Sequence, residues 1–367
     1  MIKKINIPRV LIAPLDWGLG HTTRCIPLIN AFITNGFEVF VACNFVQRSL
    51  LEKEFRNITF LELPGYEITY SRKKSALIFK LIGQLPKIIR RIGFERQWLK
   101  EKIGEYGFTI IVSDNRFGLY NRTVPSIFIT HQLTIKAPVA FVELLLQKVN
   151  YKYINRFTTC WVPDLEGNKN IAGILSHPNK LPNVPVEYMG LLSRFTHIDS
   201  IEKKYDYCIS LSGPEPQRTI LEQKILEEIN KVEGTILLVR GKPNETTIFS
   251  APVHVEVCNH LPGPALAQAF LQSNYIISRT GYTTVMELLA LQCKSILIPT
   301  PGQTEQEYLL ERLKAQGWCY GIDQSEFSLL QTIEEAKRFT YTLPDRVELF
   351  NAQKLQQLLQ KVGPKTV

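Results

Sequence analysis

The sequence lacks any apolar run long enough to cross a membrane. Although 45% of its 367 residues are hydrophobic, no stretch approaches the roughly 20 consecutive apolar residues that a spanning helix needs. Lys3 and Lys4 precede an apolar segment, residues 10–15, but that segment is too short for the hydrophobic part of a secretory signal. We therefore predict a cytoplasmic protein.

The sequence also lacks paired cysteines. Its seven cysteines form no Cys-x-x-Cys motif and are odd in number, so neither a zinc site nor a disulfide framework is indicated. Four of them, Cys43, Cys160, Cys208 and Cys258, fall in apolar runs typical of strands. This placement favours small buried thiols in a reducing compartment.

Length and charge narrow the possibilities further. A single core seldom grows far beyond about 250 residues, so the chain is expected to form two domains. The net charge of +9 indicates attraction to something anionic. Most of this charge lies in residues 72–102, where ten Lys or Arg stand against two Glu, a local charge of +8.

Residues 72–102 are amphipathic as well as basic. Apolar residues such as Leu85, Ile89 and Ile92 recur at helical spacing, which predicts a helix, or a pair of helices broken near Pro86. Two interpretations stay open. One is a helix that packs one face and solvates the other, and the second is a surface that binds an anionic membrane. Nucleic acid is disfavoured as a partner, because no recognisable binding motif accompanies the charge.

The segment 274–306 is the most informative part of the chain. Its pattern predicts a strand, a helix from Tyr282 and a second strand at 295–299. The turn before the helix, Ser278-Arg279-Thr280-Gly281, places a cation and two hydroxyls where the helix begins. Such a terminus attracts anions, and phosphate above all, because its first N–H groups are unpaired. Glu287, nearly two turns into the helix, is either a ligand for ribose hydroxyls or a solvated surface acid.

These residues belong to a longer pattern. It reads Leu266-Ala267-x-Ala269-Phe270, then Arg279-x-Gly281-x-x-Thr284-Val285-x-Glu287, then Pro299 and Gln306. This pattern resembles the C-terminal, donor-binding domain of GT-B glycosyltransferases. The likeness is greatest to the lipid-linked N-acetylglucosaminyltransferase of peptidoglycan synthesis, MurG, and extends more loosely to the UDP-glucuronosyltransferases.

The resemblance implies roles for individual residues in binding a nucleotide-sugar. The turn Arg279-Thr280-Gly281 would face the diphosphate, Glu287 would hold the ribose, and Gln306 would reach the donor sugar. Two departures from the family pattern, Thr304 for an aspartate and Glu307 for a second glutamine, leave the identity of the sugar open.

A second motif lies near the N-terminus. The predicted strand Arg9–Pro14 leads into Gly18-x-Gly20-His21-x-x-Arg24 and a helix. A dinucleotide-binding fold would need a third glycine and an acid at the end of the second strand, but Thr23 and Asn44 occupy those positions, so NAD binding is disfavoured. The loop resembles that of the same GT-B enzymes and is also similar to that of the UDP-sugar hydrolase of pseudaminic acid synthesis, PseG.

His21 and Asp114 form a candidate catalytic pair. Asp114 ends the predicted strand 109–113, and the carboxyl ends of parallel strands line the ligand crevice, so it is expected near His21. Several inverting GT-B enzymes use such a pair, with histidine as base and aspartate as its orienter. The alternatives are a capping or packing role for His21 and a turn cap for Asp114. Arg24 and His131 are predicted acceptor contacts, and Gly20 a donor contact.

Two further loops are implied to bind the donor. Ser212-Gly213 follows the predicted strand 205–211, where relatives approach the donor phosphate, although a turn that only begins the next helix explains the Gly and Pro there equally well. His260-Leu261 follows the predicted strand 253–258, where relatives hold the nucleobase through backbone groups.

These observations predict an α/β protein of GT-B fold, with two doubly wound Rossmann-like domains facing across a cleft. Residues 1–190 would bind the acceptor, 191–204 link the domains, and 205–341 bind the donor. Residues 342–367, with a helix expected from Pro344 to Gln360, would cross back to the first domain. The expected activity is inverting transfer from a nucleotide-sugar, with UDP favoured, to a hydroxyl acceptor, for which a lipid-linked group at the inner membrane face is one option.

No cofactor is expected, and no metal, because the Asp-x-Asp motif of the other large glycosyltransferase fold is missing. Two alternatives remain. One is a hydrolase or epimerase that acts on the UDP-sugar itself, and the other is a non-catalytic module that binds nucleotide-sugars.

Overall fold

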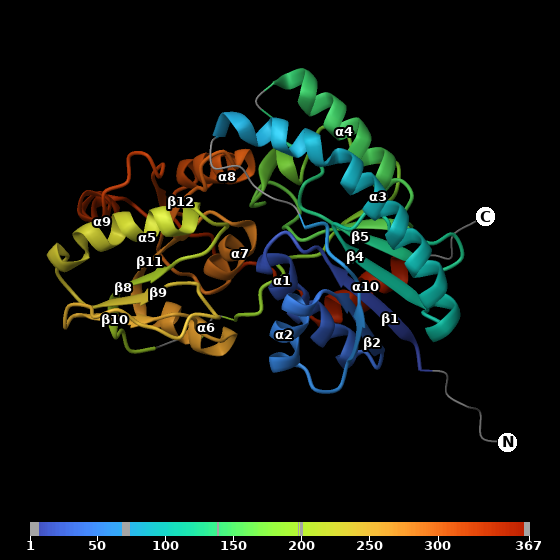
Figure 1. Ribbon diagram of the computed structural model, residues 1–367, viewed down its shortest axis with the longest axis horizontal. Coiled ribbons are helices and arrows are strands. Elements are labelled where there is room, and N and C mark those ends of the chain that lie inside the picture. Colours follow the sequence, from blue (N-terminus) through green and yellow to red (C-terminus); the bar gives the residue numbers. More distant parts are fainter. Residues whose placement is uncertain (1–6, 68–73, 138, 197, 199–200, 363–367) are drawn as a thin grey trace. The chain divides into compact units, whose positions relative to one another are not determined.

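The computed structural model describes residues 7–67, 74–137, 139–196, 198 and 201–362, with the backbone alone for residues 74–82 and 140. The chain forms two compact units (Figure 1). The first comprises Met1–Thr69, Ile78–Leu192 and Glu348–Val367, and the second comprises Tyr70–Leu77 and Ser193–Val347. The predicted α/β class is confirmed, because each unit is built on a parallel sheet with helices.

The first unit contains a seven-stranded sheet in the order β3-β2-β1-β4-β5-β6-β7. Its strands are β1 (Arg9–Pro14), β2 (Glu38–Cys43), β3 (Thr59–Glu62), β4 (Ile110–Asp114), β5 (Ser126–Ile129), β6 (Thr159–Val162) and β7 (Val186–Tyr188). The central strands β1 and β4 are almost wholly apolar and buried, as expected of parallel strands covered on both faces. The strand order reverses between β1 and β4, which is where ligands bind in folds of this type.

The helices of the first unit are α1 (Leu19–Thr34), α2 (Phe45–Glu54), α3 (Lys74–Tyr106), α4 (Ala140–Ile154) and α10 (Ala352–Lys361), with a 3₁₀ turn η1 (Gly173–Leu175). The start of α3, up to Leu77, is assigned to the second unit. Of the two alternatives for the basic segment, the structure shows the single helix, because α3 continues through Pro86. Arg72 and Lys73, at the start of the basic segment, lie outside the described residues.

Helix α10 belongs to the first unit although it ends the chain. It packs against α1, and the side chain of Asn35 donates a hydrogen bond to the carbonyl of Ala352 at 3.0 Å. We predicted a helix from Pro344, but it begins at Ala352, because Asn351 caps it and the preceding segment is extended: Leu349 bridges to Leu191.

The second unit contains a six-stranded sheet in the order β10-β9-β8-β11-β12-β13. Its strands are β8 (Tyr205–Ser210), β9 (Ile236–Val239), β10 (Val255–Cys258), β11 (Ser273–Arg279), β12 (Ser295–Ile298) and β13 (Tyr320–Gly321). Its helices are α5 (Gln217–Glu228), α6 (Gly263–Leu271), α7 (Tyr282–Ala290), α8 (Thr304–Ala315) and α9 (Leu329–Arg338), with a 3₁₀ turn η2 (Ile229–Lys231). The order reverses between β8 and β11, so the turns after these two strands meet at one edge.

Candidate active site

His21 and Asp114 meet at the point where the strand order of the first unit reverses. Asp114 ends β4 and lies in register with Pro14, the last residue of β1. Gly18 adopts a φ of 90°, which lets the chain turn from β1 into α1 and places His21 in the first turn of that helix. His21 Nδ1 lies 3.1 Å from Asp114 Oδ2. The predicted pair is therefore in contact.

Asp114 is held by a second partner, Arg24. The guanidinium Nε donates to Asp114 Oδ2 at 2.8 Å, and Nη2 donates to Oδ1. We expected Arg24 to contact the acceptor, but its side chain is only 2% exposed and faces the carboxylate. Its Nη1 also lies 3.3 Å from Nδ1 of His131, which is buried too. Arg24 and His131 thus surround Asp114.

The charges around this pair determine its protonation. Burial alone would raise the pKa of Asp114, but Arg24 and His21 hold that pKa well below its usual range. Burial and the charge of Arg24 lower the pKa of His21, and they outweigh the opposite effect of Asp114. His21 is therefore neutral at pH 7. An ionised Asp114 requires Nδ1 to carry the proton, so the lone pair is on Nε2, and 17% of the side chain is exposed. Such an arrangement can act chemically as a general base.

A buried ion pair between Glu95 and Arg116 braces the loop that follows Asp114. Glu95, on α3, accepts hydrogen bonds from Arg116 Nη1 at 2.9 Å, the Tyr66 hydroxyl at 2.8 Å and the Gly118 amide at 3.0 Å. Arg116 Nε donates to the carbonyl of Pro14 at 2.9 Å. The network ties α3 to the ends of β1 and β4. Sequence analysis missed it, because its residues are far apart in the chain.

In the second unit, Arg279 ends β11 and is 2% exposed. Its Nη2 donates to the carbonyl of Gln217 at 2.7 Å, and Nη1 donates to that of Pro299 at 3.1 Å. No carboxylate of the described residues forms an ion pair with it, and burial lowers its pKa to about 10. A desolvated guanidinium without a counter-charge favours an anion as its missing partner.

Three buried polar atoms at this edge have no hydrogen-bond partner within the described part of the chain: Arg279 Nε, Thr280 Oγ1 and Thr300 Oγ1. A Cβ on Gly213 would lie 3.7 Å from Thr300 Oγ1 and 4.0 Å from Arg279 Nε, so the exposed Ser212-Gly213 turn covers them directly. Gly213 has a φ of 101°, which other residues rarely adopt. Gly281 precedes α7, whose first turn carries no acid. Unpaired donors and a helix N-terminus together suit an anion.

Glu287 is not a solvated surface acid, because it is only 4% exposed. Its Oε1 accepts a hydrogen bond from Arg194 Nε at 2.6 Å. Burial raises the pKa of Glu287, and the charge of Arg194 opposes that shift. Sequence analysis missed Arg194, which lies in the segment that we predicted to be a linker. A cation in a loop carries no sequence signal for its partner, 93 residues away.

Gln306 lies on α8 and holds the loop that precedes this helix. Its side-chain oxygen accepts from the Thr300 amide at 2.8 Å, and its Nε2 donates to the side-chain oxygen of Gln303 at 2.5 Å. His260 is exposed and Leu261 half-buried, shortly after β10. The predicted donor residues of the second unit therefore follow the carboxyl ends of β8, β10, β11 and β12.

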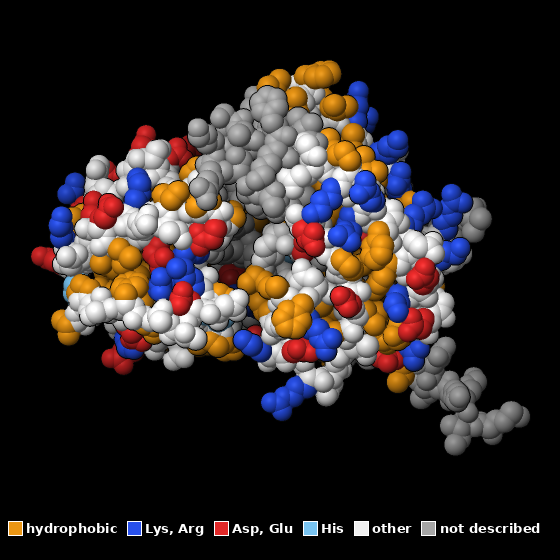
Figure 2. Space-filling view, in the orientation of Figure 1, with side chains coloured by type: hydrophobic (Ala, Val, Ile, Leu, Met, Phe, Trp, Pro, Cys, Tyr) orange, Lys and Arg blue, Asp and Glu red, His pale blue; other side chains and the backbone are white. Residues whose placement is uncertain are grey.

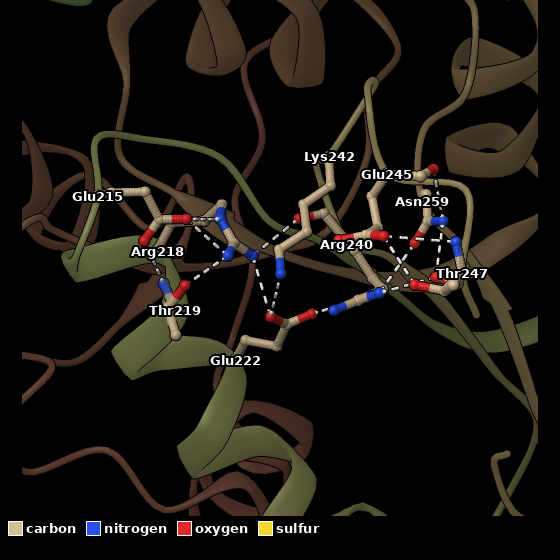
Figure 3. Close-up of polar contacts among 9 residues, drawn as sticks. All are labelled: Glu215, Arg218, Thr219, Glu222, Arg240, Lys242, Glu245, Thr247 and Asn259. Atoms are coloured by element: carbon tan, nitrogen blue, oxygen red, sulfur yellow. Dashed lines mark hydrogen bonds and ion pairs between the residues drawn. The ribbon is translucent and has the colours of Figure 1, made fainter. Parts of the chain in front are cut away.

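A cluster of polar and charged side chains, with Arg218, Glu222 and Arg240 buried, joins α5 to the segments that follow β9 and β10 (Figure 3). Glu222, on α5, accepts from Arg218 at 3.1 Å and from Arg240 at 2.5 Å, and Arg240 also donates to Asn259 at 2.9 Å. Arg240 directly follows β9 and Asn259 directly follows β10, so the cluster holds together the loops that precede His260. The fit is tight, because a Cβ on the following Gly241 would lie 2.2 Å from the carbonyl oxygen of Leu211.

The described residues contain no group of three or more His, Cys, Asp or Glu placed to hold a metal ion. All seven cysteines are free thiols, and six are buried. Of the four that we placed in strands, Cys258 is the half-buried one.

Comparison with known proteins extends these observations. Residues 217–361 match the sequence model of the glycosyltransferase family 28 C-terminal domain. An uncharacterized glycosyltransferase of Methanosarcina acetivorans is 23% identical over 380 residues, which cover 98% of this chain and 96% of that protein. Another, of Methanosarcina mazei, is 24% identical over 362 residues, which cover 93% of this chain and 89% of that protein.

Solved structures share the fold over nearly the whole chain. The kitacinnamycin glycosyltransferase has a TM-score of 0.65 at 14% identity, covering 97% of this chain and 94% of that one. SnogD of Streptomyces nogalater has a TM-score of 0.63 at 12% identity, covering 97% of this chain and 100% of that one. MurG of Acinetobacter baumannii has a TM-score of 0.56 at 13% identity, covering 96% of this chain and 99% of that one. The fold is that of GT-B glycosyltransferases, and the predicted resemblance to that group is confirmed.

Proposed function

We propose that the protein is an inverting, metal-independent glycosyltransferase that moves a sugar from a UDP-sugar to an acceptor hydroxyl. Glycosyltransferase activity is supported by the family match and by the relatives. The main support for the mechanism is that the buried Asp114 carboxylate contacts Nδ1 of His21. The pair supplies a base where an acceptor hydroxyl needs one.

The proposed reaction is a single displacement. His21 Nε2 takes the proton from the acceptor hydroxyl, and the oxygen attacks the anomeric carbon of the donor sugar. The bond from that carbon to the β-phosphate oxygen breaks, and UDP leaves with the electron pair. Asp114 keeps the proton on Nδ1 and stabilises the imidazolium, while Arg24 and His131 hold Asp114 in place on the acceptor side. A base of this kind typically contributes about 10²–10⁴-fold to the rate.

The turns of the second unit would bind the donor. Arg279, Thr280 and Gly281, with Ser212-Gly213 above them, would meet the diphosphate and the charge that develops as it leaves. The unpaired Arg279 Nε, the two unpaired threonine hydroxyls and the lowered pKa of Arg279 support this assignment. It also explains why a cation is buried there without a carboxylate.

The residues proposed to bind the other parts of the donor lie at the same edge of the sheet. Glu287 would accept the hydrogen bonds of the ribose hydroxyls, and Arg194 opposes the rise in the Glu287 pKa that burial causes. The backbone of His260-Leu261 would hold the base, and Gln306 would act on the donor sugar through the Thr300–Gln303 loop that it supports. Gly20, exposed at the start of α1, would be a further donor contact.

For the acceptor we propose a lipid-linked hydroxyl, which the protein would meet at the inner face of a membrane as a peripheral cytoplasmic enzyme. The support is the charge of residues 72–102. No helix among the described residues has the length and apolarity to pass through a bilayer.

The second candidate function is hydrolysis of the UDP-sugar, and the Gly18-x-Gly20-His21 loop favours it because it also resembles the loop of a UDP-sugar hydrolase. His21 would then activate water. An epimerase or a non-catalytic nucleotide-sugar-binding module is the remaining alternative.

One experiment separates these functions. A panel of radiolabelled nucleotide-sugars is incubated with the protein, with and without a bacterial or archaeal lipid extract, and products are resolved for wild type and His21→Ala. Label that moves into lipid only with wild-type protein supports transfer. Free sugar released without extract indicates hydrolysis, and donor binding without any turnover indicates a binding module.

A further inference from the structure

The loop proposed to hold the nucleobase, His260-Leu261, lies between two fixed points. On one side Pro262 directly precedes α6. Its carbonyl accepts from the amide of Leu266 at 2.9 Å, and its ring disfavours a helical backbone at Leu261. On the other side Asn259 is held by hydrogen bonds through both its side chain and its backbone. Because only two residues connect these points, the backbone groups of the loop have little freedom to turn.

Asn259 uses every polar group of its side chain. Its Oδ1 accepts from Arg240 Nη1 at 2.9 Å, and its Nδ2 donates to the carbonyls of Glu245 and Thr247 at 2.8 and 3.0 Å. Its backbone carbonyl accepts from the amide of Lys242 at 2.7 Å. These bonds tie the residue directly before the nucleobase loop to the segment that follows β9.

Arg240 connects Asn259 to the interior of the second unit. Its Nε donates to Glu222 Oε1 at 2.5 Å, so one planar guanidinium binds the carboxylate and the asparagine together (Figure 3). The other oxygen of Glu222 accepts from Arg218 at 3.1 Å. Burial alone would raise the pKa of Glu222, but hydrogen bonds from Arg240 and Arg218 hold it below its ordinary value, so Glu222 is ionised at pH 7. Arg218, Glu222, Arg240 and Asn259 form the Arg240 network.

The other end of the Arg240 network lies at the turns proposed to bind the diphosphate. Arg218 Nη1 donates to the carbonyl of Arg240 at 3.2 Å. Arg218 directly follows Gln217, whose carbonyl accepts from Arg279 Nη2 at 2.7 Å. The first turn of α5 therefore contacts both the segment after β9 and the buried Arg279. The network reaches from the proposed phosphate-binding guanidinium to the proposed nucleobase loop.

Two simpler explanations of this cluster are weak. A second anion site is disfavoured, because the nine residues drawn in Figure 3 include three cations and three acids. Figure 2 likewise shows Lys and Arg side chains next to Asp and Glu side chains on the second unit, in the region between α5 and α6. Stability alone is also a poor reason for three buried charges, because their attraction only about offsets the cost of removing them from water.

We propose that Arg240, held by Glu222, is a positioning residue that sets the nucleobase specificity of the donor site. It would fix Asn259, and through it the direction of the backbone N–H and carbonyl groups of His260-Leu261. Uracil presents an acceptor at its 4-position where cytosine presents an amino donor, so a backbone group of fixed direction can bind one base and not the other. This inference rests on the proposed binding of UDP, and its new element is the network that selects the base.

The test is calorimetric titration of the full chain with UDP and CDP, which share the ribose and the diphosphate and differ only in the base. We expect the wild type to bind UDP more tightly. Arg240→Lys keeps a cation next to Glu222, but an ammonium lacks the planar fork that binds Glu222 and Asn259 together. It should lower the ratio of UDP to CDP affinity about threefold to tenfold, because about one hydrogen bond to the base is lost.

Asn259→Ala removes the other side of the same contact and should lower the ratio by a similar factor. The double variant should behave like either single variant, because both changes break one link. Arg338→Lys is the matched control. It changes an exposed arginine on α9 of the same unit and should leave the ratio unchanged. Thermal unfolding confirms that each variant is folded.

A preference for UDP that persists in Arg240→Lys and Asn259→Ala overturns this inference alone and leaves the donor site in place. Equal losses of UDP and CDP affinity also overturn it, because a general loosening of the unit would act on the ribose and diphosphate that the two ligands share. Absence of UDP binding to the wild type contradicts the proposed function itself, and with it the inference.

Discussion

Asp114 is ionised and His21 is neutral, and a general base needs both of these protonation states. The carboxylate stays ionised although it is 1% exposed, because Arg24 meets it with two donors. The imidazole stays neutral, because burial and Arg24 disfavour a second positive charge. Loss of either feature would leave Nε2 with the wrong protonation.

Replacing His21 with alanine should slow sugar transfer by about 10²–10⁴-fold and leave the Kd for UDP unchanged, because the side chain acts on the acceptor proton. The measurements are kcat with a saturating donor and calorimetric titration with UDP. His254→Ala is the control, because this half-buried histidine lies near the carbonyl of Ile229 in the second unit. Turnover of His21→Ala at the wild-type rate would rule out His21 as the base.

The pH dependence follows from the lowered pKa of His21. The active form is the neutral one, so kcat/KM should be constant at neutral pH and fall only as the pH drops below 6.5, the ordinary pKa of histidine. Asp114, whose pKa lies well below its usual range, should add no limb above about pH 4. Asp114→Asn removes a negative charge that raises the His21 pKa, so the acid limb should move to lower pH while kcat falls.

A pH profile of kcat/KM on both proteins checks this, together with thermal unfolding of Asp114→Asn, which replaces the carboxylate beside the buried Arg24 with a neutral amide. An acid limb in the wild type that lies above the ordinary histidine pKa of 6.5 would contradict the account.

At the scale of single residues, sequence patterns predicted His21 beside Asp114 and an anion-binding turn at Arg279. They did not predict what each side chain touches. Arg24 was expected at the acceptor and instead binds Asp114. Arg194 gave no signal at all, because its partner Glu287 is on another element and nothing in a loop sequence records a distant ion pair.

Among the elements, α3 has two different faces. Its outer side carries cations and exposed apolar residues, whereas Glu95 on its inner side is fully buried against Arg116 and Tyr66. The amphipathic pattern predicted the helix and its charge. It did not predict a buried acid. Glu95 is flanked in the sequence by several cations, and the sequence alone does not indicate which residue pairs with it.

Pro86 shows a limit of local rules. It removes one backbone donor from the helix interior, and a pair of helices broken there was one of the two predicted alternatives. The helix continues because its next turns are held by tertiary packing, through Ile88, Ile92 and Glu95.

Glu95→Ala should destabilise the protein by about 3–5 kcal/mol, because it removes the nearer carboxylate from the buried Arg116 and leaves that guanidinium with the more distant Asp16, 3.9 Å away. Urea unfolding followed by circular dichroism measures the change. Glu101→Ala, on the exposed side of the same helix, should change stability by less than about 0.5 kcal/mol. Equal effects of the two substitutions would show that the buried pair does not brace the loop after Asp114.

For the whole molecule, two separated motifs were enough to predict the architecture. A glycine loop after the first strand and a glycine turn before α7 each indicate a parallel sheet with its ligand edge at the strand ends. The family resemblance predicted that the last helix returns to the first unit, and α10 packs on α1. Its start at Ala352 was not predictable, because Pro344 can begin a helix as readily as an extended segment.

The measurement that tests the central claim most directly is calorimetric titration of the protein with UDP, GDP and dTDP, repeated on Glu287→Ala. The account predicts preferential binding of UDP and a loss of about tenfold or more in the variant, because two ribose hydroxyls lose a charged acceptor. Glu311→Ala, which removes an exposed acid from α8, should bind UDP like the wild type. Binding of none of the three nucleotides, or unchanged UDP affinity in Glu287→Ala, would contradict the proposed donor site.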